Sequence, residues 1–455
     1  MSLENYKSLY HKHCKSIQKS YFHFLSFKSI SSEPEYKGEC LKCASWLEKY
    51  LHEAGFSVEV IPTSGNPLLL ANYHLDRTKP TVMFYGHYDV QPVDPIELWQ
   101  TDPFNATIVD NNVYARGAQD DKGQIFSVLS ALKQIKEIDG GFPLNVKLCI
   151  EGDEEHGSQG LSEIIKQQRD KLIADYLVIV DVGWDAPDEP SITMGVRGIA
   201  CMSVELSGSK TDLHSGLFGG LAYNPNRAMV ELLSKLHHEN GKVCVPGFYD
   251  KVQLPGEQEL KLLNQDIHQK DMENDLGITI AGGEKEFSPY YWRCLRPTLE
   301  INGLGGGYSG NGFKTVIPAK AIAKLSVRLV PDQDPNEIVE LIEKFLRAQA
   351  HPAMKLTFTL HPGVGKALRT SPTSLIAKAA AQAISDVNSK PCAYILDGAS
   401  IPITTELAQA ACAETVLIGY GLPGDQIHAP NEHFGLDRFE KSFLTTCRLI
   451  ELLGA

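Results

Sequence analysis

Short apolar segments that alternate with helical stretches constrain the fold of this chain more than any other feature of its sequence. Four such segments have the composition of buried strands: 81–85 (TVMFY), 144–150 (LNVKLCI), 176–180 (YLVIV) and 415–418 (TVLI). Between the first two, apolar residues recur on one face of a predicted helix at 124–138. Strands separated by helices in this way are typical of βα units around a mostly parallel sheet. The sequence therefore predicts an α/β fold.

The pattern of predicted strands and helices changes near residue 196 and changes back near residue 365. In this interval, alternating strands are predicted at 199–206 and 321–330, together with a helix at 227–237. The alternation of apolar strands and helices resumes after the second boundary. We therefore predict a discontinuous sheet domain, with an inserted α+β domain between its two parts. The predicted divisions are 1–195 and 366–455 for the sheet domain and 196–365 for the insertion.

The composition excludes several classes of partner. The chain has 455 residues, with 43 Lys and Arg against 56 Asp and Glu, and its net charge is −13. A protein this acidic is repelled by phosphate backbones and by anionic lipid, so we expect no nucleic-acid partner and no membrane partner. No apolar run approaches the roughly 20 residues that span a bilayer, and the first 30 residues lack the apolar segment of a signal peptide. We therefore expect a cytoplasmic protein.

Ten cysteines are scattered along the chain and predict reduced thiols, since they are too sparse for a disulfide framework. Cys40 and Cys43 form a CxxC pair inside a segment whose apolar residues recur at helical spacing. A zinc ribbon or finger needs a second pair of ligands nearby, and the sequence has none. We therefore expect both cysteines to lie on a helix face without metal or redox chemistry.

Histidines and acidic residues follow the carboxyl ends of the predicted strands, where open α/β sheets bind their ligands. The residues concerned are His87, Asp89, Asp120, Asp121, the acidic run 151–155, Asp181 and His428. Carboxylates outnumber histidines, and no cysteine is among them. This composition favours paired divalent ions over a single structural zinc, because carboxylate oxygens can bridge two cations and offset their repulsion.

Seven segments resemble the motifs of the M20 metallopeptidases, and their order and spacing hold from about residue 80 to residue 433. The segments are FYGHYDVQP (84–92), YARGAQDDKG (114–123), IEGDEEHGSQG (150–160), VDVG (180–183), DLHSGLFGG (212–220), SVRLVP (326–331) and IHAPNEH (427–433). The chain length and the segment ELWQTDPF (97–104) look most like the branch of cytosolic nonspecific dipeptidases and carnosinases. The resemblance implies a catalytic domain of the di-zinc exopeptidase type with a mostly parallel sheet, and an inserted lid and dimerisation domain.

The same resemblance implies two divalent metal ions per subunit, with Zn²⁺ as the first expectation and Mn²⁺ or Co²⁺ as alternatives. Asp120 matches the carboxylate that bridges the two ions. His87 and Asp181 would complete the ligands of one ion, and Glu155 and His428 those of the other.

Two further residues are implied to serve catalysis without binding the metals. Glu154 matches the general base that activates the attacking water and then passes the proton to the leaving amine. Asp89 lies two residues past His87 on a near-extended segment, so it can accept the second imidazole N–H and fix the tautomer. The family also implies a cis peptide bond between Asp120 and Asp121.

Other matched residues concern the substrate and the partner subunit. In related dimeric enzymes the histidine that matches His214 reaches into the partner's active site and polarises the scissile carbonyl. This match predicts a homodimer formed through the inserted domain. Arg328 suits a substrate carboxylate, which its guanidinium can bind bidentately. Thr315 and Ser400 are expected to contact the same substrate, a short peptide with a free C-terminal carboxylate.

One segment departs from the family pattern. Dipeptidases of this branch typically carry Arg-Glu-Gly-Gly-Ser-Ile-Pro where this chain has LDGASIP at 396–402. The first expectation remains metal-dependent hydrolysis of dipeptides. An N-acyl amino acid amidohydrolase of the same family is the alternative, because it shares every catalytic residue. A noncatalytic binding protein on a peptidase fold is a further alternative, although it predicts loss of the ligands or the base, and all of them are present.

Overall fold

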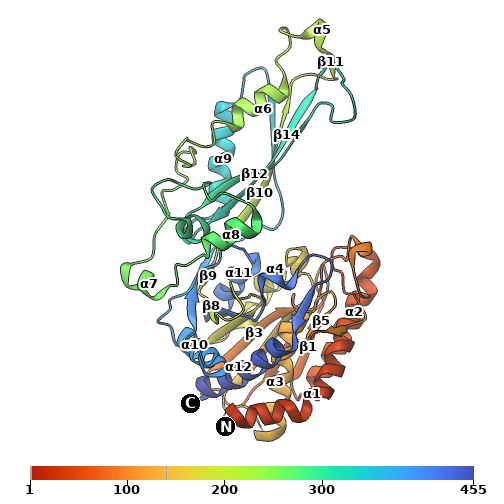
Figure 1. Ribbon diagram of the computed structural model, residues 1–455, viewed down its shortest axis with the longest axis vertical. Helices are drawn as coiled ribbons and strands as arrows, with labels where there is room; N and C mark the ends of the chain where they lie inside the picture. The colour runs from red at the N-terminus through yellow and green to blue at the C-terminus, as the bar shows by residue number, and fades with distance from the viewer. Residues whose placement is uncertain (1–2, 140) are drawn as a thin grey trace.

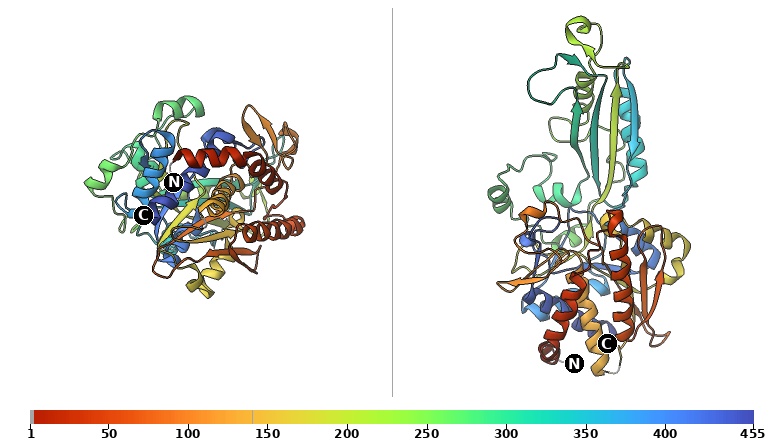
Figure 2. Two further views of the ribbon diagram at one scale, coloured as in Figure 1. Left: turned by 90° about the horizontal axis from the view of Figure 1, so that it is seen from below. Right: turned by 90° about the vertical axis from the view of Figure 1, so that its right-hand side faces the viewer.

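Two sheets organise the molecule, which a computed structural model describes over residues 3–139 and 141–455 (Figure 1). An eight-stranded sheet lies in the lower part of the view, close to both chain ends, and a four-stranded sheet stands above it. The side view in Figure 2 shows that the upper sheet extends away from the lower one. The predicted α/β fold with an inserted α+β domain is confirmed.

The large sheet contains all four predicted strands. Its order is β1 (Ser57–Ile61), β2 (Leu68–Tyr73), β6 (Asn145–Glu151), β3 (Thr81–His87), β7 (Tyr176–Val180), β18 (Glu414–Ile418), β8 (Ser191–Thr193) and β17 (Ala393–Ile395). The four strands β6, β3, β7 and β18 run parallel to one another in the centre of the sheet. The antiparallel pairs β1–β2 and β2–β6 lie at one edge. The carboxyl ends of the central strands therefore meet at a single edge of the sheet.

Helices cover both faces of this sheet, and the alternation of side chains along each strand explains why. In β3, Val82 and Phe84 pack into one apolar cluster, whereas Met83 and Tyr85 pack into another on the opposite face. The first cluster includes α1 (Leu3–Leu25), α2 (Lys37–Glu53), α3 (Lys122–Asp139), α10 (Leu375–Asn388) and α12 (Leu436–Gly454). The second includes α4 (Gln159–Gln167) and α11 (Pro402–Ala411). The helix predicted at 124–138 is α3.

Cys40 and Cys43 lie on the buried face of α2, as the sequence predicts. Burial raises the pKa of the Cys40 thiol to about 12 and that of the Cys43 thiol to about 11. Both thiols are therefore protonated near neutral pH, which disfavours metal or redox chemistry at this pair.

The inserted domain has its own antiparallel sheet and its own core. The sheet order is β12 (Thr298–Gly306), β14 (Lys320–Leu329), β10 (Gly198–Ser207) and β15 (Lys355–Leu360). Apolar side chains of α6 (Pro225–Leu233) and α9 (Pro335–Gln349) complete a cluster separate from those of the large sheet. The strands predicted at 199–206 and 321–330 are β10 and β14. The helix predicted at 227–237 ends earlier, at Leu233, because His237 forms an antiparallel bridge with Val243.

Smaller elements connect and extend these two parts. The short pair β9 (Gly195–Val196) and β16 (Leu368–Arg369) lies where the chain passes between the two sheets. At the far tip of the inserted domain, β11 (Leu213–His214) pairs with β13 (Val316–Ile317) beside α5 (Ser215–Phe218) (Figure 1). A long excursion carries α7 (Glu257–Leu262), α8 (Gln269–Leu276) and a π-helical turn at Tyr291–Leu295. A third small sheet consists, in this order, of β19 (His433–Gly435), β5 (Asn112–Tyr114) and β4 (Thr107–Val109).

No helix within residues 3–139 or 141–455 combines the length and the apolar character needed to cross a bilayer.

Candidate two-metal active site

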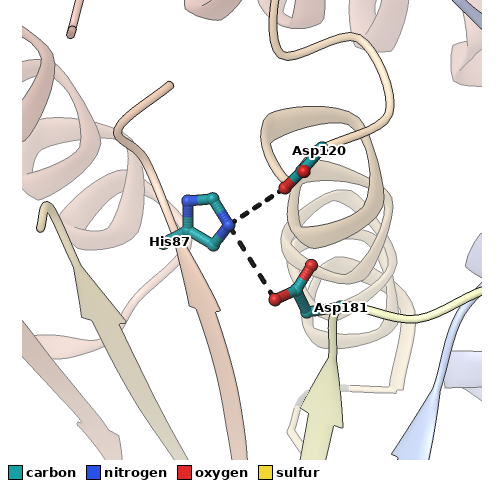
Figure 3. A group of neighbouring side chains, drawn as sticks. All are labelled: His87, Asp120 and Asp181. Atoms are coloured by element: carbon teal, nitrogen blue, oxygen red, sulfur yellow. Dashed lines mark ion pairs between the residues drawn. The ribbon is translucent and has the colours of Figure 1, made fainter. Parts of the chain in front are cut away.

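The first half of the site is built by two adjacent parallel strands and one loop. His87 is the last residue of β3, and Asp181 directly follows β7. Asp120 comes from the loop that precedes α3, and Figure 3 shows the three side chains pointing toward one another. His87 Nε2 lies 3.2 Å from Asp120 Oδ1 and 4.0 Å from Asp181 Oδ2. These distances leave the three groups able to share one cation.

The second half of the site uses the other oxygen of the same aspartate. His428 Nε2 lies 2.9 Å from Asp120 Oδ2 and 3.2 Å from Glu155 Oε2. Glu155 belongs to a single 3₁₀ turn, Glu154–His156, that begins shortly after β6. In each group of three residues, the potential ligand atoms lie within 4.8 Å of one another. The structure therefore brings the five predicted ligands together, with Asp120 shared between the two groups.

The chemistry of these donors fits two divalent ions. Three carboxylates and two imidazoles converge, a set suited to paired ions such as Zn²⁺, Mn²⁺ or Co²⁺. The imidazole of His87 is fully buried, and among the described residues its Nε2 has no hydrogen-bond partner of acceptable geometry. A buried polar nitrogen without a partner is unfavourable unless another group, here a cation, completes it.

The charges of the site show the same need for cations. Burial raises the pKa of Asp181 well above its usual value, and it also raises the pKa of Glu155. Burial acts on Asp120 in the same direction, but the nearby imidazoles of His428 and His87 hold its pKa below the usual range. In return, the Asp120 and Glu155 carboxylates raise the pKa of His428 to about 10. The protonated imidazole thus supplies positive charge that bound metal ions would otherwise provide.

Glu154 lies beside the ligands without belonging to either group. Its side chain is half-buried, and burial raises its pKa to about 7, with the neighbouring Glu155 carboxylate adding to the effect. A carboxylate with a pKa near the working pH can both accept and return a proton. This property suits the general base that the sequence predicts at this position.

Asp89 lies on the opposite side of the His87 imidazole from Asp120. Its carboxylate is fully buried, and its Oδ1 lies 3.3 Å from His87 Nδ1. The same carboxylate accepts hydrogen bonds from the main-chain N–H groups of Glu154, at 3.2 Å, and Glu155, at 3.1 Å. Asp89 therefore links the imidazole to the turn that carries the predicted base.

Glu432 is a residue of the site that sequence reasoning missed. Its buried carboxylate accepts four hydrogen bonds at 2.7 to 3.0 Å, from the Arg116 guanidinium and from the main-chain N–H groups of Gly117, Gln119 and Asp120. It thereby holds the loop that carries the shared aspartate. Glu432 lies in the matched segment 427–433, so its motif could be recognised in the sequence. Its hydrogen bonds to residues 116–120, more than 300 positions earlier in the chain, could not.

Two other contacts hold the ligands in place. Gln91 Nε2 donates a hydrogen bond of 2.8 Å to Glu155 Oε2. Asp121 Oδ2 accepts a hydrogen bond of 3.0 Å from the main-chain N–H of His87. The peptide bond between Asp120 and Asp121 is cis, which agrees with the expectation from the resemblance.

His214 and Thr315 lie together at the tip of the inserted domain, far from the metal ligands of the same chain (Figure 1). Both are exposed, and the main-chain N–H of Ser215 donates to the Thr315 carbonyl at 3.0 Å. The His214 imidazole accepts a hydrogen bond of 3.1 Å from the Gly216 N–H. Neither residue can reach the active site of its own chain in this conformation.

Arg328 lies at the opposite end of the same domain from Thr315. It pairs with Ile199 in the register of β10 and β14, at the end of the sheet that adjoins β9. Residues 320–328 separate it from the tip and span about 25 Å when extended. The structure therefore does not bring Arg328 and Thr315 to one short peptide within a single chain.

A cavity of about 280 Å³ opens beside the first half of the site, and Asp120 and Asp181 form part of its wall. Ser400 lies in the loop that borders this cavity, and its hydroxyl donates to the Gly198 carbonyl at 3.2 Å. Polar and apolar side chains complete the wall, among them Trp184, Asp185, Arg293, Ile395, Asp397, Ile401, Leu422 and Ile427.

A parallel sheet with paired metal ligands at its carboxyl edge, together with an inserted lid, defines a metal-dependent hydrolase of the two-metal type. The model of peptidase family M20/M25/M40 matches residues 83–452, and the chain belongs to this family. The resemblance noted in the sequence is thereby confirmed.

Relatives of known activity cover most of the chain. The Cys-Gly metallodipeptidase of Schizosaccharomyces pombe is 34% identical over 86% of this chain and 83% of its own length. The human Beta-Ala-His dipeptidase is also 34% identical, over 80% of this chain and 73% of its own length. Among solved structures, an M20 family metallo-carboxypeptidase from Sulfolobus solfataricus superposes with a TM-score of 0.88 at 32% identity, covering 96% of this chain and 99% of that one.

Proposed function

We propose that the protein is a two-metal dipeptidase that hydrolyses the peptide bond of short peptides. The observation that carries the proposal is the shared Asp120, whose two oxygens face two separate groups of ligands. The similarity to two dipeptidases over most of the chain supports the substrate class. An N-acyl amino acid amidohydrolase finds no comparable support among these relatives.

In the proposed mechanism, His87 and Asp181 would hold one divalent ion, Glu155 and His428 would hold the other, and Asp120 would offer one carboxylate oxygen to each group. When bound, such ions lower the pKa of water and polarise a carbonyl oxygen. Glu154 takes a proton from the attacking water and delivers it to the amine that leaves. The main-chain carbonyl of Asp89, at 3.1 Å, accepts the Nδ1 proton of His87, and the Asp89 carboxylate lies beside the same nitrogen at 3.3 Å, so that Nε2 is the nitrogen available for a metal.

The proposed substrate is a dipeptide with a free C-terminal carboxylate. The cavity of about 280 Å³ lies just below the usual range for ligand pockets, so it suits a small molecule. Arg328 is proposed to bind the carboxylate, and its guanidinium forms no ion pair with any carboxylate whose side chain the structure describes. Ser400 borders the same cavity and is proposed to contact the substrate.

The departure at 396–402 lies only partly in the wall of this cavity. Leu396 is buried in the core of the sheet domain, and its carbonyl accepts a hydrogen bond of 3.1 Å from the Cys294 thiol. Leucine therefore replaces the arginine typical of the branch at a buried position behind the cavity, and not in the cavity wall. Asp397, in contrast, lines the cavity. Its shorter side chain is the part of the departure proposed to affect the choice of substrate.

A homodimer is proposed to complete the active site. The tip that carries His214 also exposes large apolar side chains, with Leu217 69%, Leu221 81% and Phe313 102% exposed. An apolar surface of this kind is typical of a protein interface. We propose that the tip docks beside the active site of a second copy, where His214 and Thr315 would contact the substrate.

The two separate cores support a division into a catalytic domain at 1–195 and 366–455 and a lid at 196–365. Zinc as the physiological metal and a cytosolic location remain predictions.

Mixing two inactive variants tests the dimer. His214→Ala removes the residue proposed to enter the partner's active site, and Glu154→Gln removes the base of the chain's own active site. After unfolding and joint refolding of equal amounts, half of the dimers carry one site with both groups, so about one quarter of the wild-type activity should return. Activity that stays at the level of the separate variants would contradict a shared site.

A competition experiment tests the substrate class. Metal-free protein is reloaded with Zn²⁺ or Mn²⁺ and given dipeptides, tripeptides and N-acyl amino acids together, and every substrate is followed by mass spectrometry. We expect metal-dependent loss of the dipeptides first. Selective loss of the N-acyl amino acids would overturn the proposal in favour of the amidohydrolase.

A further inference from the structure

The segment that follows α1 lies directly against the end of the strand that carries His87. The main-chain N–H of Val90 donates to the Ser29 carbonyl at 3.0 Å, and the Ser29 hydroxyl donates to the Tyr88 carbonyl at 2.6 Å. The buried Lys122 ammonium, next to the loop that carries Asp120, donates to the Phe27 carbonyl at 2.7 Å. The segment 27–31 is therefore hydrogen-bonded both to the chain that follows His87 and to Lys122, which follows the Asp120 loop. It lies outside the residues 83–452 that match the family model.

One side chain of this segment reaches the site itself. The Ser31 hydroxyl donates a hydrogen bond of 2.7 Å to Asp89 Oδ2, the shortest that this carboxylate receives. The same oxygen accepts the Glu155 N–H at 3.1 Å, while Oδ1 faces His87 Nδ1 at 3.3 Å and the Glu154 N–H at 3.2 Å. All four contacts together determine the rotation of the carboxylate about its Cβ–Cγ bond.

We propose that Ser31 is a positioning residue for the metal centre. Without its hydroxyl, Oδ2 keeps one long hydrogen bond, and the carboxylate gains freedom to turn away from His87. The imidazole then loses one of the two oxygens that face its Nδ1, and only the main-chain carbonyl of Asp89, at 3.1 Å, is left to orient it. The turn bearing Glu154 and Glu155 loses part of its anchor. The inference rests on the proposed metal centre, and it adds a residue from a region where no metal ligand or catalytic motif lies.

The effect should appear in metal binding and in turnover, and not in substrate affinity. Ser31→Ala is expected to weaken Co²⁺ binding by about 10-fold to 100-fold, the usual range for loss of a group that orients a ligand. It should also change the visible absorption of bound Co²⁺, because the imidazole of His87 is less well oriented. We expect kcat to fall by a similar factor, and KM to stay within about twofold of the wild type, because Ser31 contacts the ligand shell and not the substrate.

Two matched variants separate this role from a general loss of packing. Ser31→Thr keeps the hydroxyl and should restore Co²⁺ affinity and kcat to within about threefold of the wild type. Ser26→Ala removes an exposed hydroxyl just after the end of α1, where it donates only to the His23 carbonyl at 2.7 Å, and should leave both quantities unchanged. The melting temperature of each metal-free variant reports whether the fold itself is affected.

The outcomes are distinct. The inference would be overturned if Ser31→Ala had the same Co²⁺ affinity and kcat as Ser26→Ala. It would also be overturned if Ser31→Thr were as impaired as Ser31→Ala. If the wild type hydrolysed no dipeptide while Ser31→Ala still lost Co²⁺ affinity, the proposed function would fail and the positioning role would stand.

Discussion

Replacing Glu432 by glutamine is the change that most sharply tests how the loop of the shared aspartate is held. Oε1 accepts the N–H groups of Gln119 and Asp120 at 2.9 and 3.0 Å. Oε2 accepts the Gly117 N–H at 2.9 Å and Arg116 Nη1 at 2.7 Å. A glutamine has nearly the same shape, but whichever way its amide turns, an NH₂ group faces two donors. Two hydrogen bonds are therefore lost and replaced by repulsion.

The magnitude follows from these contacts. Each hydrogen bond to a charged group contributes about 1.5 to 3 kcal/mol, so the loss of two amounts to about 3 to 6 kcal/mol. Breaking a buried ion pair, here with the 1% exposed Arg116, costs about 3 to 5 kcal/mol, and the two figures describe overlapping contacts. We expect Glu432→Gln to lower the free energy of unfolding by about 3 to 5 kcal/mol. Metal affinity should fall by about 10-fold to 100-fold, because the Asp120 backbone is released.

Urea unfolding of the metal-free protein at pH 8 measures the first effect, since burial raises the pKa of Glu432 and its ionised form must be present. Titration with Co²⁺ measures the second. Glu414→Gln is a matched control, because this exposed carboxylate accepts the Leu375 N–H at 3.0 Å near the start of α10, which contributes only about 1 kcal/mol. If Glu432→Gln were no more destabilised than this control and bound Co²⁺ like the wild type, the role assigned to Glu432 would be wrong.

Three further predictions concern the site itself. Glu154→Gln should leave two metal ions bound, as measured by elemental analysis, while kcat falls by several orders of magnitude; near-normal turnover would remove Glu154 from the role of base. Because the pKa of His428 is raised to about 10, its imidazole carries a second proton in the metal-free chain at pH 7. Metal binding must release this proton, so Co²⁺ affinity should rise between pH 6 and 9 by up to about tenfold per pH unit, and calorimetry that finds no proton release would contradict this. Arg328→Ala should raise KM for a dipeptide far more than it lowers kcat, and equal kinetics on a free and an amidated C-terminus in the wild type would exclude the carboxylate contact.

Much of the fold and the core of the site could be predicted because both depend on local patterns. The strand at 176–180 has the same bounds in sequence and structure, since five consecutive apolar residues suit a strand buried on both faces. His87 and Asp181 each end or follow such a strand, and parallel neighbours bring those ends together without further information.

Other features depend on contacts that no local pattern records. Glu432 and Ser31 act on residues far from them in the sequence, across a buried loop and a strand end. Thr315 and Arg328 lie close in the sequence and look like parts of one substrate site, yet the length of β14 puts them at opposite ends of the inserted domain. The helix predicted at 227–237 was too long because a backbone bridge from His237 replaced its last turn.

Titration of the metal-free protein with Zn²⁺, while hydrolysis of a dipeptide is followed, tests the central claim most directly. The account predicts that activity requires two equivalents of Zn²⁺ per chain, because Asp120 serves two groups of ligands. It also predicts that the same dipeptide with an amidated C-terminus is hydrolysed poorly at every point of the titration. Full activity at one equivalent, or no hydrolysis of dipeptides at two, would contradict the account.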